Sequence, residues 1–298
     1  MIDLPAYLDR RRREIDDFLA DWLRARRDAD FPRVWEAMEY ALLAGGKRIR
    51  PILALAAAEA VGGDARTAMP FACAIEMIHA YSLVHDDLPC MDDDDLRRGR
   101  PANHKVFGEG MAVLAGDGLL ALAFELLADV STWQDVYHHE ALAAIREIAR
   151  AAGPSGMVGG QSLDLLAERA PIDEGRLRLL HAGKTGALIR AAVFAGARLS
   201  GADDREMEDL LAYAERIGLA FQVRDDLLDL SGDAATLGKA AGKDAAKGKA
   251  TFPAVLGRAA AEELLARLTR EAVAALDPFS ASADPLRALA TYVARRAA

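Results

Sequence analysis

Apolar residues recur at intervals of three and four along nearly the whole chain, and runs that alternate between apolar and polar residues are absent. This spacing is the period of a helix with one buried face, whereas a half-buried strand has a period of two. Glycine and proline separate the periodic segments, as at Gly45-Gly46, Gly62-Gly63 and Gly153-Pro154. The sequence therefore predicts an all-α protein, with helices at roughly 6–24, 32–44, 51–61, 66–88, 111–128, 135–150, 155–168, 173–182, 185–200, 204–230, 251–270 and 284–296.

Composition narrows the class of protein further. Of the 298 residues 52% are hydrophobic and 6% aromatic, which is typical of a globular helical protein and argues against disorder. The formal net charge of −9 argues against nucleic acid as a partner. Two cysteines, Cys73 and Cys90, are too few for a disulfide scaffold, so we expect a cytoplasmic location. Charged residues interrupt every apolar stretch and no composition shift divides the chain, so we expect no membrane span and a single domain over 1–298.

One group of carboxylates lies near the end of the helix predicted over 204–230. Asp225 and Asp229 are four residues apart and therefore share a helix face. With Gln222 and Asp226 they form a polar stripe in an otherwise apolar segment. Taken alone, this stripe is more typical of a solvated helix face than of a binding site.

The second group, Asp86 to Asp92, is more unusual. Asp86 and Asp92 are six residues apart, which places them on nearly opposite sides of an ideal helix. Pro89 lies between them and disrupts a helix by removing a backbone donor. If two residues near Pro89 loop out, Asp92 returns to the spacing that Asp225 and Asp229 have. Two sets of carboxylates then face each other, which predicts a site for a divalent cation and a phosphate-bearing substrate.

Two other kinds of metal site do not fit the residues of this region. The sequence Glu76-x-x-His79 matches half of the Glu-x-x-His pair of di-iron bundles, but the chain has no second copy. A single histidine at this place is more often a core residue than a ligand. The run from Asp92 to Asp95 resembles a calcium loop, yet Arg97 stands where the required glycine would be.

Basic residues gather in three further places. A glycine turn at Gly45-Gly46 leads through Lys47, Arg48 and Arg50 into a new helix, and a helix N-terminus favours an anion. Arg97 and Arg98 follow the first aspartates, and Lys184-Thr185-Gly186 interrupts a helical region. The stretch 231–250 is rich in alanine, glycine and lysine, and composition alone favours a flexible surface loop over a flap that closes on an anionic substrate.

With these motifs the sequence resembles the short-chain trans-isoprenyl diphosphate synthases, and within that family the bacterial farnesyl diphosphate synthases. The shared segments, in the family's order, are GGKRIRP at 45–51, YSLVHDDLPCMDDDDLRRGRP at 81–101, NHKVFGE at 103–109, GGQSLDL at 159–165, GKTGALI at 183–189, FQVRDDLLD at 221–229 and TLGK at 236–239. The resemblance covers nearly the whole chain. It implies the isoprenoid synthase fold, with about 10–13 mostly antiparallel helices around a central active-site cavity, assembled as a homodimer.

The resemblance also implies roles for individual residues. It implies about three Mg²⁺ ions bound with diphosphate, Mn²⁺ being an alternative. Their main ligands would be Asp86, Asp92 and Asp225, supported by Asp87, Asp226 and Asp229. The allylic diphosphate would contact Arg97, Lys184, Thr185, Gln222, Lys239 and Lys249. Isopentenyl diphosphate would contact Gly46, Lys47, Arg50, His79 and Arg98. The catalytic set would be Asp86, Asp92, Arg97, Lys184, Asp225 and Lys239, and a flap over 231–250 would shield the reaction.

The implied reaction condenses isopentenyl diphosphate with dimethylallyl or geranyl diphosphate by ionisation, condensation and elimination. In the family the fifth residue before the first aspartate forms the floor of the cavity, and here it is Tyr81. A helical wheel alone would select Ser82. A bulky ring at 81 predicts farnesyl diphosphate, a C15 product, with C20 geranylgeranyl diphosphate as the alternative. A terpene cyclase and a non-catalytic partner subunit are less consistent with two intact aspartate motifs.

Overall fold

The computed structural model describes residues 2–133, 136–167, 172–230 and 250–295, which are almost wholly helical. Its first half contains α1 (Leu4–Arg26), α2 (Pro32–Leu42), α3 (Ile49–Ala60), α4 (Ala65–Asp86), α5 (Asn103–Phe107) and α6 (Glu109–Ala128). Its second half contains α7 (His138–Ala152), α8 (Met157–Ala167), α9 (Glu174–His181), α10 (Ala187–Leu199), α11 (Asp204–Leu230), α14 (Phe252–Leu256), α15 (Arg258–Ala274) and α16 (Asp284–Arg295). The predicted all-α class is confirmed.

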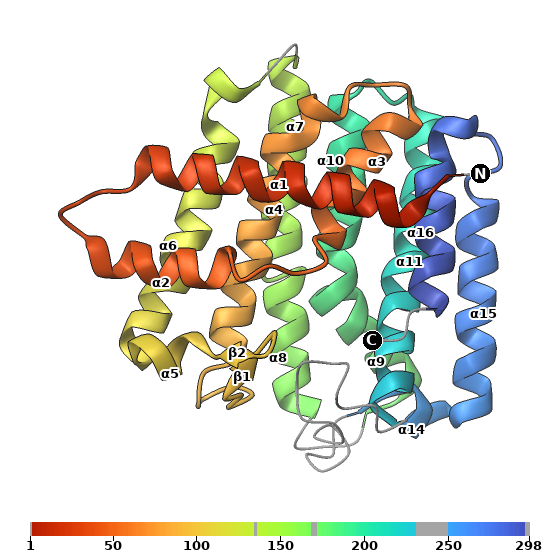
Figure 1. Ribbon diagram of the computed structural model, residues 1–298. Helices are drawn as coiled ribbons and strands as arrows, with labels where there is room; N and C mark the ends of the chain where they lie inside the picture. Colours follow the sequence, from red (N-terminus) through yellow and green to blue (C-terminus); the bar gives the residue numbers. More distant parts are fainter. Residues whose placement is uncertain (1, 134–135, 168–171, 231–249, 296–298) are drawn as a thin grey trace.

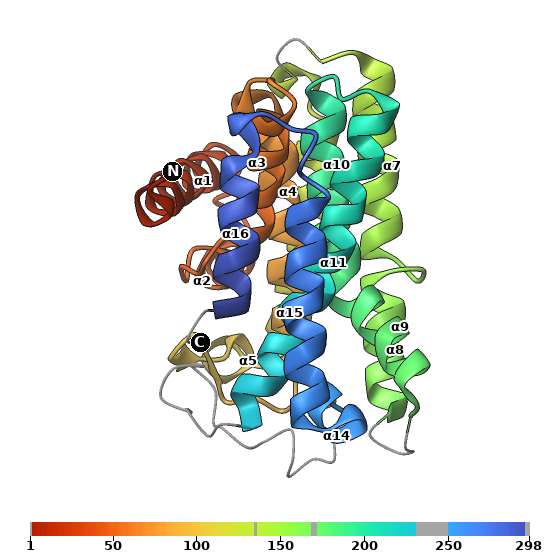
Figure 2. The same ribbon diagram turned by 90° about the vertical axis from the view of Figure 1, so that its right-hand side faces the viewer.

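Most of the helices run along one common direction, while α1 and α2 lie across them on one side (Figures 1 and 2). The buried helix α4 packs against α3, α6 and α10. Residues of α3 and α10 are small enough for close approach, since a Cβ on Gly196 would lie 1.9 Å from the carbonyl oxygen of Ala54. This packing gives α4 a fixed position in the interior.

The helix boundaries agree with the sequence over most of the chain and differ where a local feature intervenes. The helix expected over 251–270 is broken at Gly257, which lies between α14 and α15. Its φ of 82° is incompatible with a continuous helix. The five-residue helix α5 was not predicted, because so short a segment leaves no periodic pattern. The helix expected to reach residue 88 ends at Asp86.

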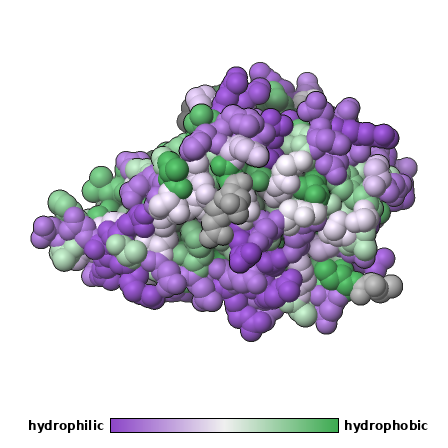
Figure 3. All heavy atoms as spheres, turned by 90° about the horizontal axis from the view of Figure 1, so that it is seen from above, coloured by the Kyte–Doolittle hydropathy of each residue, from purple (hydrophilic) through white to green (hydrophobic). Residues whose placement is uncertain are grey.

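A two-stranded antiparallel hairpin follows α4 and was also absent from the prediction. It pairs β1 (Leu96–Arg97) with β2 (Arg100–Pro101). Two residues per strand are too few for an alternating pattern to be recognised. The hairpin lies near the lower end of the molecule in Figure 1, beside α5. The opposite end, seen in Figure 3, is largely hydrophilic with scattered hydrophobic residues.

Two helices, α4 and α6, are long and apolar enough to span a membrane by length and composition. The expectation that no apolar stretch reaches that length was therefore wrong. In α4 the apolar residues serve the interior, because 72% of its most apolar window is buried within the protein. The corresponding window of α6 is 44% buried, and Val113 and Leu114 are exposed on it. The expected single-domain organisation stays a prediction.

Candidate active site

The chain reverses direction after α4 through a backbone turn that brings Asp92 close to Asp86. The amide of Asp92 donates to the carbonyl oxygen of Asp86 at 2.8 Å, and the amide of Asp94 donates to that of Asp87 at 3.2 Å. An α-helical bond spans four residues, so a bond that spans six accommodates two extra ones. The predicted looping out of residues near Pro89 is confirmed.

A cavity of about 400 Å³ opens beside the C-terminal end of α4. Its walls come from α4, from α8, and from η2, a π-helical turn at Ala182–Gly186 that joins α9 to α10. The polar side chains of the lining are those of Arg50, His79, Asp86, Gln161, Lys184 and Thr185, among others. The aromatic and apolar side chains include those of Tyr81, Leu83, Met157, Val158 and Leu165. The cavity thus combines charged groups with an apolar wall, as the sequence predicted.

Asp86 faces two groups on the opposite wall. Gln161 Nε2 donates to Asp86 Oδ1 at 2.5 Å, and Lys184 Nζ lies 3.9 Å from the same oxygen. Lys184 is itself held by Asp164 Oδ2 at 2.5 Å. Gln161 and Asp164 lie on α8 and were missing from the predicted site. Their signal is the segment GGQSLDL, one of the segments in which the sequence resembles the family.

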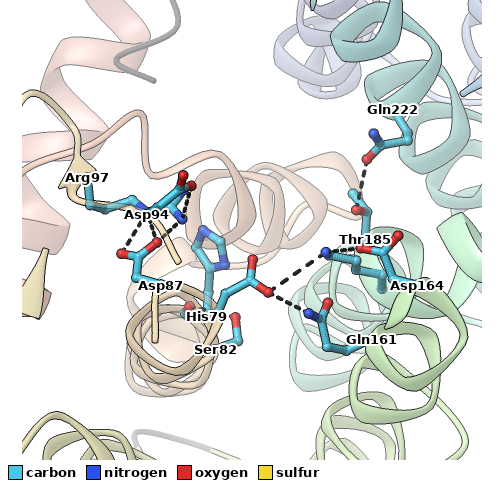
Figure 4. Close-up of polar contacts among 11 residues, drawn as sticks. His79, Ser82, Asp87, Asp94, Arg97, Gln161, Asp164, Thr185 and Gln222 are labelled. Atoms are coloured by element: carbon cyan, nitrogen blue, oxygen red, sulfur yellow. Dashed lines mark hydrogen bonds and ion pairs between the residues drawn. The ribbon is translucent and has the colours of Figure 1, made fainter. Parts of the chain in front are cut away.

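Arg97 lies on the other side of His79 and is tied to the first aspartate motif (Figure 4). Its Nε donates to both carboxylate oxygens of Asp87, at 2.9 and 3.0 Å, and its Nη2 also contacts Asp87. Asp94 lies 3.7 Å from Arg97 Nη2. Burial lowers the pKa of Arg97, but the hydrogen bonds to Asp87 and the negative charges of Asp87, Asp86 and Asp94 together outweigh burial, so the pKa is raised. Arg97 therefore stays charged and orients the loop after α4.

Among the residues predicted to bind isopentenyl diphosphate, Lys47 is exposed, and Gly46, Arg50, His79 and Arg98 lie close together. Gly46 allows a close approach by Arg98, since a Cβ there would lie 2.7 Å from the Arg98 guanidinium carbon. Arg98 also donates to the carbonyl oxygen of Gly45. Burial and the neighbouring cations Arg50 and Arg98 hold the pKa of His79 well below its usual value. His79 is thus neutral at physiological pH.

The buried carboxylate of Glu76 lies next to this basic cluster and was not predicted as part of the site. Glu76 accepts a hydrogen bond of 2.8 Å from Arg48, and both side chains are almost fully buried, with exposures of 2% and 1%. Arg48 also donates to Asp16 at 2.8 Å and to the carbonyl oxygen of Leu42 at 2.7 Å. Glu76 lies 3.9 Å from Arg98 and offsets part of the positive charge.

The three carboxylates of the second aspartate motif differ in their burial and partners. Asp225 and Asp229 are half-buried, and Asp225 lies near enough to Arg50 to raise the pKa of that guanidinium, although burial lowers it more. Asp226 points elsewhere, since its carboxylate accepts from Gln222 Nε2 at 2.8 Å and from the amide of Phe252 at 2.9 Å. Asp226 thus holds α14 against α11, a structural role that the sequence did not predict.

Thr185 and Gln222 meet across the site. Thr185 Oγ1 donates to Gln222 Oε1 at 3.2 Å, so the π-helical turn is joined to α11 (Figure 4). Gly160 allows α8 to approach this turn, because a Cβ on Gly160 would lie 2.0 Å from the backbone nitrogen of Lys184. The predicted residues Lys239 and Lys249, and all but the last residue of the predicted flap, lie outside the described residues.

One group of residues of the types that can bind metal lies close together in the described part of the chain. It consists of Asp93, Asp95 and His104, whose ligand atoms lie within 4.8 Å of one another. None of these was predicted as a ligand. The predicted carboxylates are arranged differently: Asp86 lines the cavity, Asp92 lies in the loop after α4, and Asp225 and Asp229 lie on α11. This arrangement still fits Mg²⁺, because that ion is usually held by one or two carboxylates together with substrate phosphates and water.

Comparison with known proteins decides the family. The polyprenyl synthetase family matches residues 32–277. The chain belongs to this family. Its helical architecture is the isoprenoid synthase fold, and the family supports the predicted prenyltransferase class, since the curated and structural matches described below are prenyl diphosphate synthases by name.

Curated relatives in plants are named for a C20 product. The putative chloroplastic geranylgeranyl pyrophosphate synthase 8 of Arabidopsis thaliana is 53% identical over 267 residues, which cover 88% of this chain and 74% of that protein. The chloroplastic geranylgeranyl pyrophosphate synthase of Capsicum annuum is 50% identical over 265 residues, which cover 88% and 71% of the two chains.

Similar solved structures are named differently. An FPP/GFPP synthase from Zymomonas mobilis has a TM-score of 0.87 and 40% identity, with coverage of 98% of this chain and 99% of that one. A putative farnesyl-diphosphate synthase from Marinomonas has a TM-score of 0.85 and 38% identity, with coverage of 99% and 100%. The family is therefore established, and the names of the relatives divide between products.

Proposed function

We propose that this chain is a farnesyl diphosphate synthase that condenses isopentenyl diphosphate head-to-tail with dimethylallyl or geranyl diphosphate. The observation that carries the proposal is the cavity beside Asp86, whose lining combines the charged Arg50, Asp86 and Lys184 with apolar side chains and the Tyr81 ring. Diphosphates require the charged part, and a growing hydrocarbon chain requires the apolar part. We propose Asp86, Asp92 and Asp225 as the principal Mg²⁺ ligands.

The proposed Mg²⁺ ions supply, when bound, positive charge that stabilises the diphosphate as a leaving group. Lys184 adds a cation on the same side, and Asp164 and Gly160 fix its position through a hydrogen bond and a close backbone contact. Thr185 offers a hydroxyl beside it. We assign these two residues to the allylic diphosphate, with Gln222 holding Thr185 in place.

Arg50 and Arg98 are the cations that we assign to isopentenyl diphosphate. Their mutual repulsion is offset by the buried carboxylate of Glu76, whose charge opposes both. Neutral His79 adds a polar ring nitrogen without further positive charge. Since its pKa is held well below the usual value, His79 does not serve as a general acid at neutral pH.

The proposed chemistry balances without a side-chain nucleophile. The allylic C–O bond breaks and its electron pair leaves with the diphosphate. The isopentenyl double bond then forms the new C–C bond to the allylic carbon, and a proton lost from the adduct goes to the released diphosphate. The apolar side chains of Leu83, Met157 and Leu165 limit access of water to the cation. Closure by residues 231–250 stays part of the proposal.

Product length is proposed from Tyr81. Its ring lies in the cavity wall, is only 7% exposed and meets the His85 ring edge-on with centroids 5.7 Å apart. A cavity of about 400 Å³ is also near the lower end of the range of about 300–1,000 Å³ for ligand sites. Both observations favour a C15 product. The names of the plant relatives favour C20 geranylgeranyl diphosphate, which we keep as the second candidate.

The proposal is tested by incubating purified protein and Mg²⁺ with labelled isopentenyl diphosphate and either dimethylallyl or geranyl diphosphate. We expect a labelled C15 diphosphate. A C20 product would replace the farnesyl assignment while leaving the reaction intact. Absence of any elongation would contradict the synthase proposal, and cyclised hydrocarbon made from added farnesyl diphosphate would identify a terpene cyclase.

Two further parts of the proposal concern the setting of the enzyme. We propose a homodimer, supported by Val113 and Leu114, which are 40% and 55% exposed on the apolar helix α6. Light scattering on the purified protein tests it, and a monomer at micromolar concentration would contradict it. We also propose the reducing cytoplasm as its location, consistent with two free cysteines of which Cys90 is exposed.

A further inference from the structure

The loop after α4 has two faces, which the four consecutive aspartates divide between them. Asp92 and Asp94 are buried, whereas Asp93 and Asp95 are exposed. The backbone of this loop is not a regular strand, because Asp93 has a φ of 50°, in the left-handed region. Asp92 and Asp94 lie on the inner side, where the amide of Asp92 bonds to Asp86 and the carboxylate of Asp94 lies 3.7 Å from Arg97. Asp93 and Asp95 form a separate group on the outer side.

A buried histidine completes this outer group. His104, at the start of α5, is only 6% exposed, and neither ring nitrogen has a hydrogen-bond partner among the described residues. A buried polar group without a partner is uncommon and requires an explanation. One ring nitrogen of His104 lies within 4.8 Å of carboxylate oxygens of Asp93 and Asp95, which lie equally close to each other. An unpartnered imidazole is thus directed at two carboxylates.

The three residues lie on both sides of the β1–β2 hairpin. Asp93 and Asp95 precede β1, and His104 follows β2. The amide of Ala102 donates to the carbonyl oxygen of Asp95 at 2.8 Å and closes the base of the hairpin. Lys105 pairs with Asp95 Oδ1 at 2.7 Å. Because a carboxylate has two oxygens, this ion pair is compatible with a further bond to a cation.

We propose that Asp93, Asp95 and His104 form a structural site for a transition-metal ion such as Zn²⁺, Mn²⁺ or Co²⁺. Imidazole nitrogen together with carboxylate oxygen suits these ions, whereas Mg²⁺ prefers oxygen ligands alone. The site is separate from the carboxylates proposed to bind Mg²⁺ with substrate. Water would complete the coordination on the exposed side.

A metal ion at this place would link the two ends of the hairpin that carries Arg97 and Arg98. A covalent or metal link across a loop stabilises it by reducing its conformational freedom. Arg97 holds Asp87, and Arg98 holds the carbonyl oxygen of Gly45. The proposed ion would therefore stabilise the positions of both arginines from outside the cavity.

The test uses the untagged full-length protein in excess Mg²⁺, which occupies sites built only from oxygen ligands. Co²⁺ is then added as a spectroscopic probe and its visible absorption is followed. We expect one equivalent of Co²⁺ to bind, to be displaced by Zn²⁺, and to raise the melting temperature by several degrees. The variant His104→Gln should lose both the absorption and the thermal shift. The control His139→Gln, which removes a largely exposed histidine, should retain both.

If His104→Gln does not fold, the double variant Asp93→Asn and Asp95→Asn replaces it, because both residues are exposed. It should also lose Co²⁺ binding while its circular dichroism stays that of the parent protein. The proposal is overturned if the parent protein binds no Co²⁺ in excess Mg²⁺. It is equally overturned if the folded variants bind Co²⁺ as the parent does.

Discussion

Gln161 on α8 donates a hydrogen bond of 2.5 Å to Asp86 at the end of α4. This bond joins the first aspartate motif to the wall that carries Lys184. It fixes one carboxylate oxygen in the orientation that a metal ligand needs, before any ion arrives. Lys184, only 3.9 Å from the same oxygen, offsets its negative charge in the meantime.

Replacement of the carboxylate itself is the most direct test. Asp86→Asn keeps the shape of the side chain and removes its charge, so we expect kcat/KM to fall by at least about 100-fold through lost metal-assisted stabilisation of the leaving diphosphate. Steady-state kinetics at saturating Mg²⁺ measure the effect. Asp17→Asn, on the surface of α1, is the matched control. Parent-like activity in the Asp86 variant would remove this residue from the site.

Gln161→Leu should act through Asp86 rather than on the substrate. With the hydrogen bond gone, the carboxylate is no longer oriented, and we expect the Mg²⁺ concentration for half-maximal rate to rise by about 10- to 100-fold. The KM for isopentenyl diphosphate should change little, because that substrate is assigned to Arg50 and Arg98. Titration of Mg²⁺ at fixed substrate separates the two. An unaltered Mg²⁺ requirement would show that the bond is not functional.

Tyr81→Ala should lengthen the product. Removal of the ring opens the apolar wall, and chain growth continues past C15 to C20 or beyond, as chromatography of the labelled products would reveal. Ser82→Ala is the control, because the Ser82 hydroxyl donates to the carbonyl oxygen of His79 within the same helix and its loss opens little space. If Tyr81→Ala still stops at the parent's product, another residue sets the limit.

Gly160→Ala tests the close contact between α8 and the π-helical turn. The added Cβ would lie 2.0 Å from the Lys184 backbone nitrogen, so the turn must shift and carry Lys184 away from its position. We expect kcat to fall by about 10- to 100-fold, in proportion to about 1.4–2.8 kcal/mol of lost stabilisation. Gly110→Ala is the control, since its Cβ would meet no atom within 4 Å. Equal activities of the two variants would exclude a role for the contact.

His181 should make the protein sensitive to acid. Burial lowers its pKa from 6.5 to about 4, and its ring packs on Phe252 with centroids 5.3 Å apart. Between those pH values the unfolded state binds a proton that the folded state does not, so the free energy of unfolding falls as pH falls, by about 3 kcal/mol from this residue. His79 acts in the same direction.

Urea unfolding at pH 7 and at pH 4.5 measures this dependence. In His181→Gln the difference between the two pH values should be smaller than in the parent protein, because a neutral side chain has no proton to gain. In His139→Gln it should stay the same, since that histidine is largely exposed. A parent-like pH dependence in His181→Gln would refute the assignment.

The sequence was sufficient for most of the long helices and for the register of the first motif. Pro89 and a six-residue spacing predicted a looped turn, and the bond from Asp92 to Asp86 has that form. The predicted helix over 204–230 coincides with α11, whose Asp225 and Asp229 were placed on one face. These features depend on neighbouring residues alone, which is why local pattern identified them.

Hydrogen bonds between residues far apart in the chain could not be predicted from local sequence patterns. Asp226 looked like one more member of the polar stripe, yet it binds the amide of Phe252, a residue 26 positions away. Glu76 resembled part of a di-iron motif and instead neutralises Arg48. In both cases the partner is supplied by tertiary packing, which spacing along one helix does not contain.

Asp86 and Tyr81 lie on the same buried helix, five residues apart, which corresponds to about 7.5 Å of axial rise. The point where the diphosphate is held and the ring that limits the hydrocarbon are thus parts of one rigid body. Shifts of α8, α10 or α11 can change the width of the cavity, but they do not alter this length. Under the proposed function, the product length would therefore stay the same when thermal fluctuations change the cavity width. Heating to a temperature below unfolding should widen the range of substrates accepted before it widens the range of product lengths.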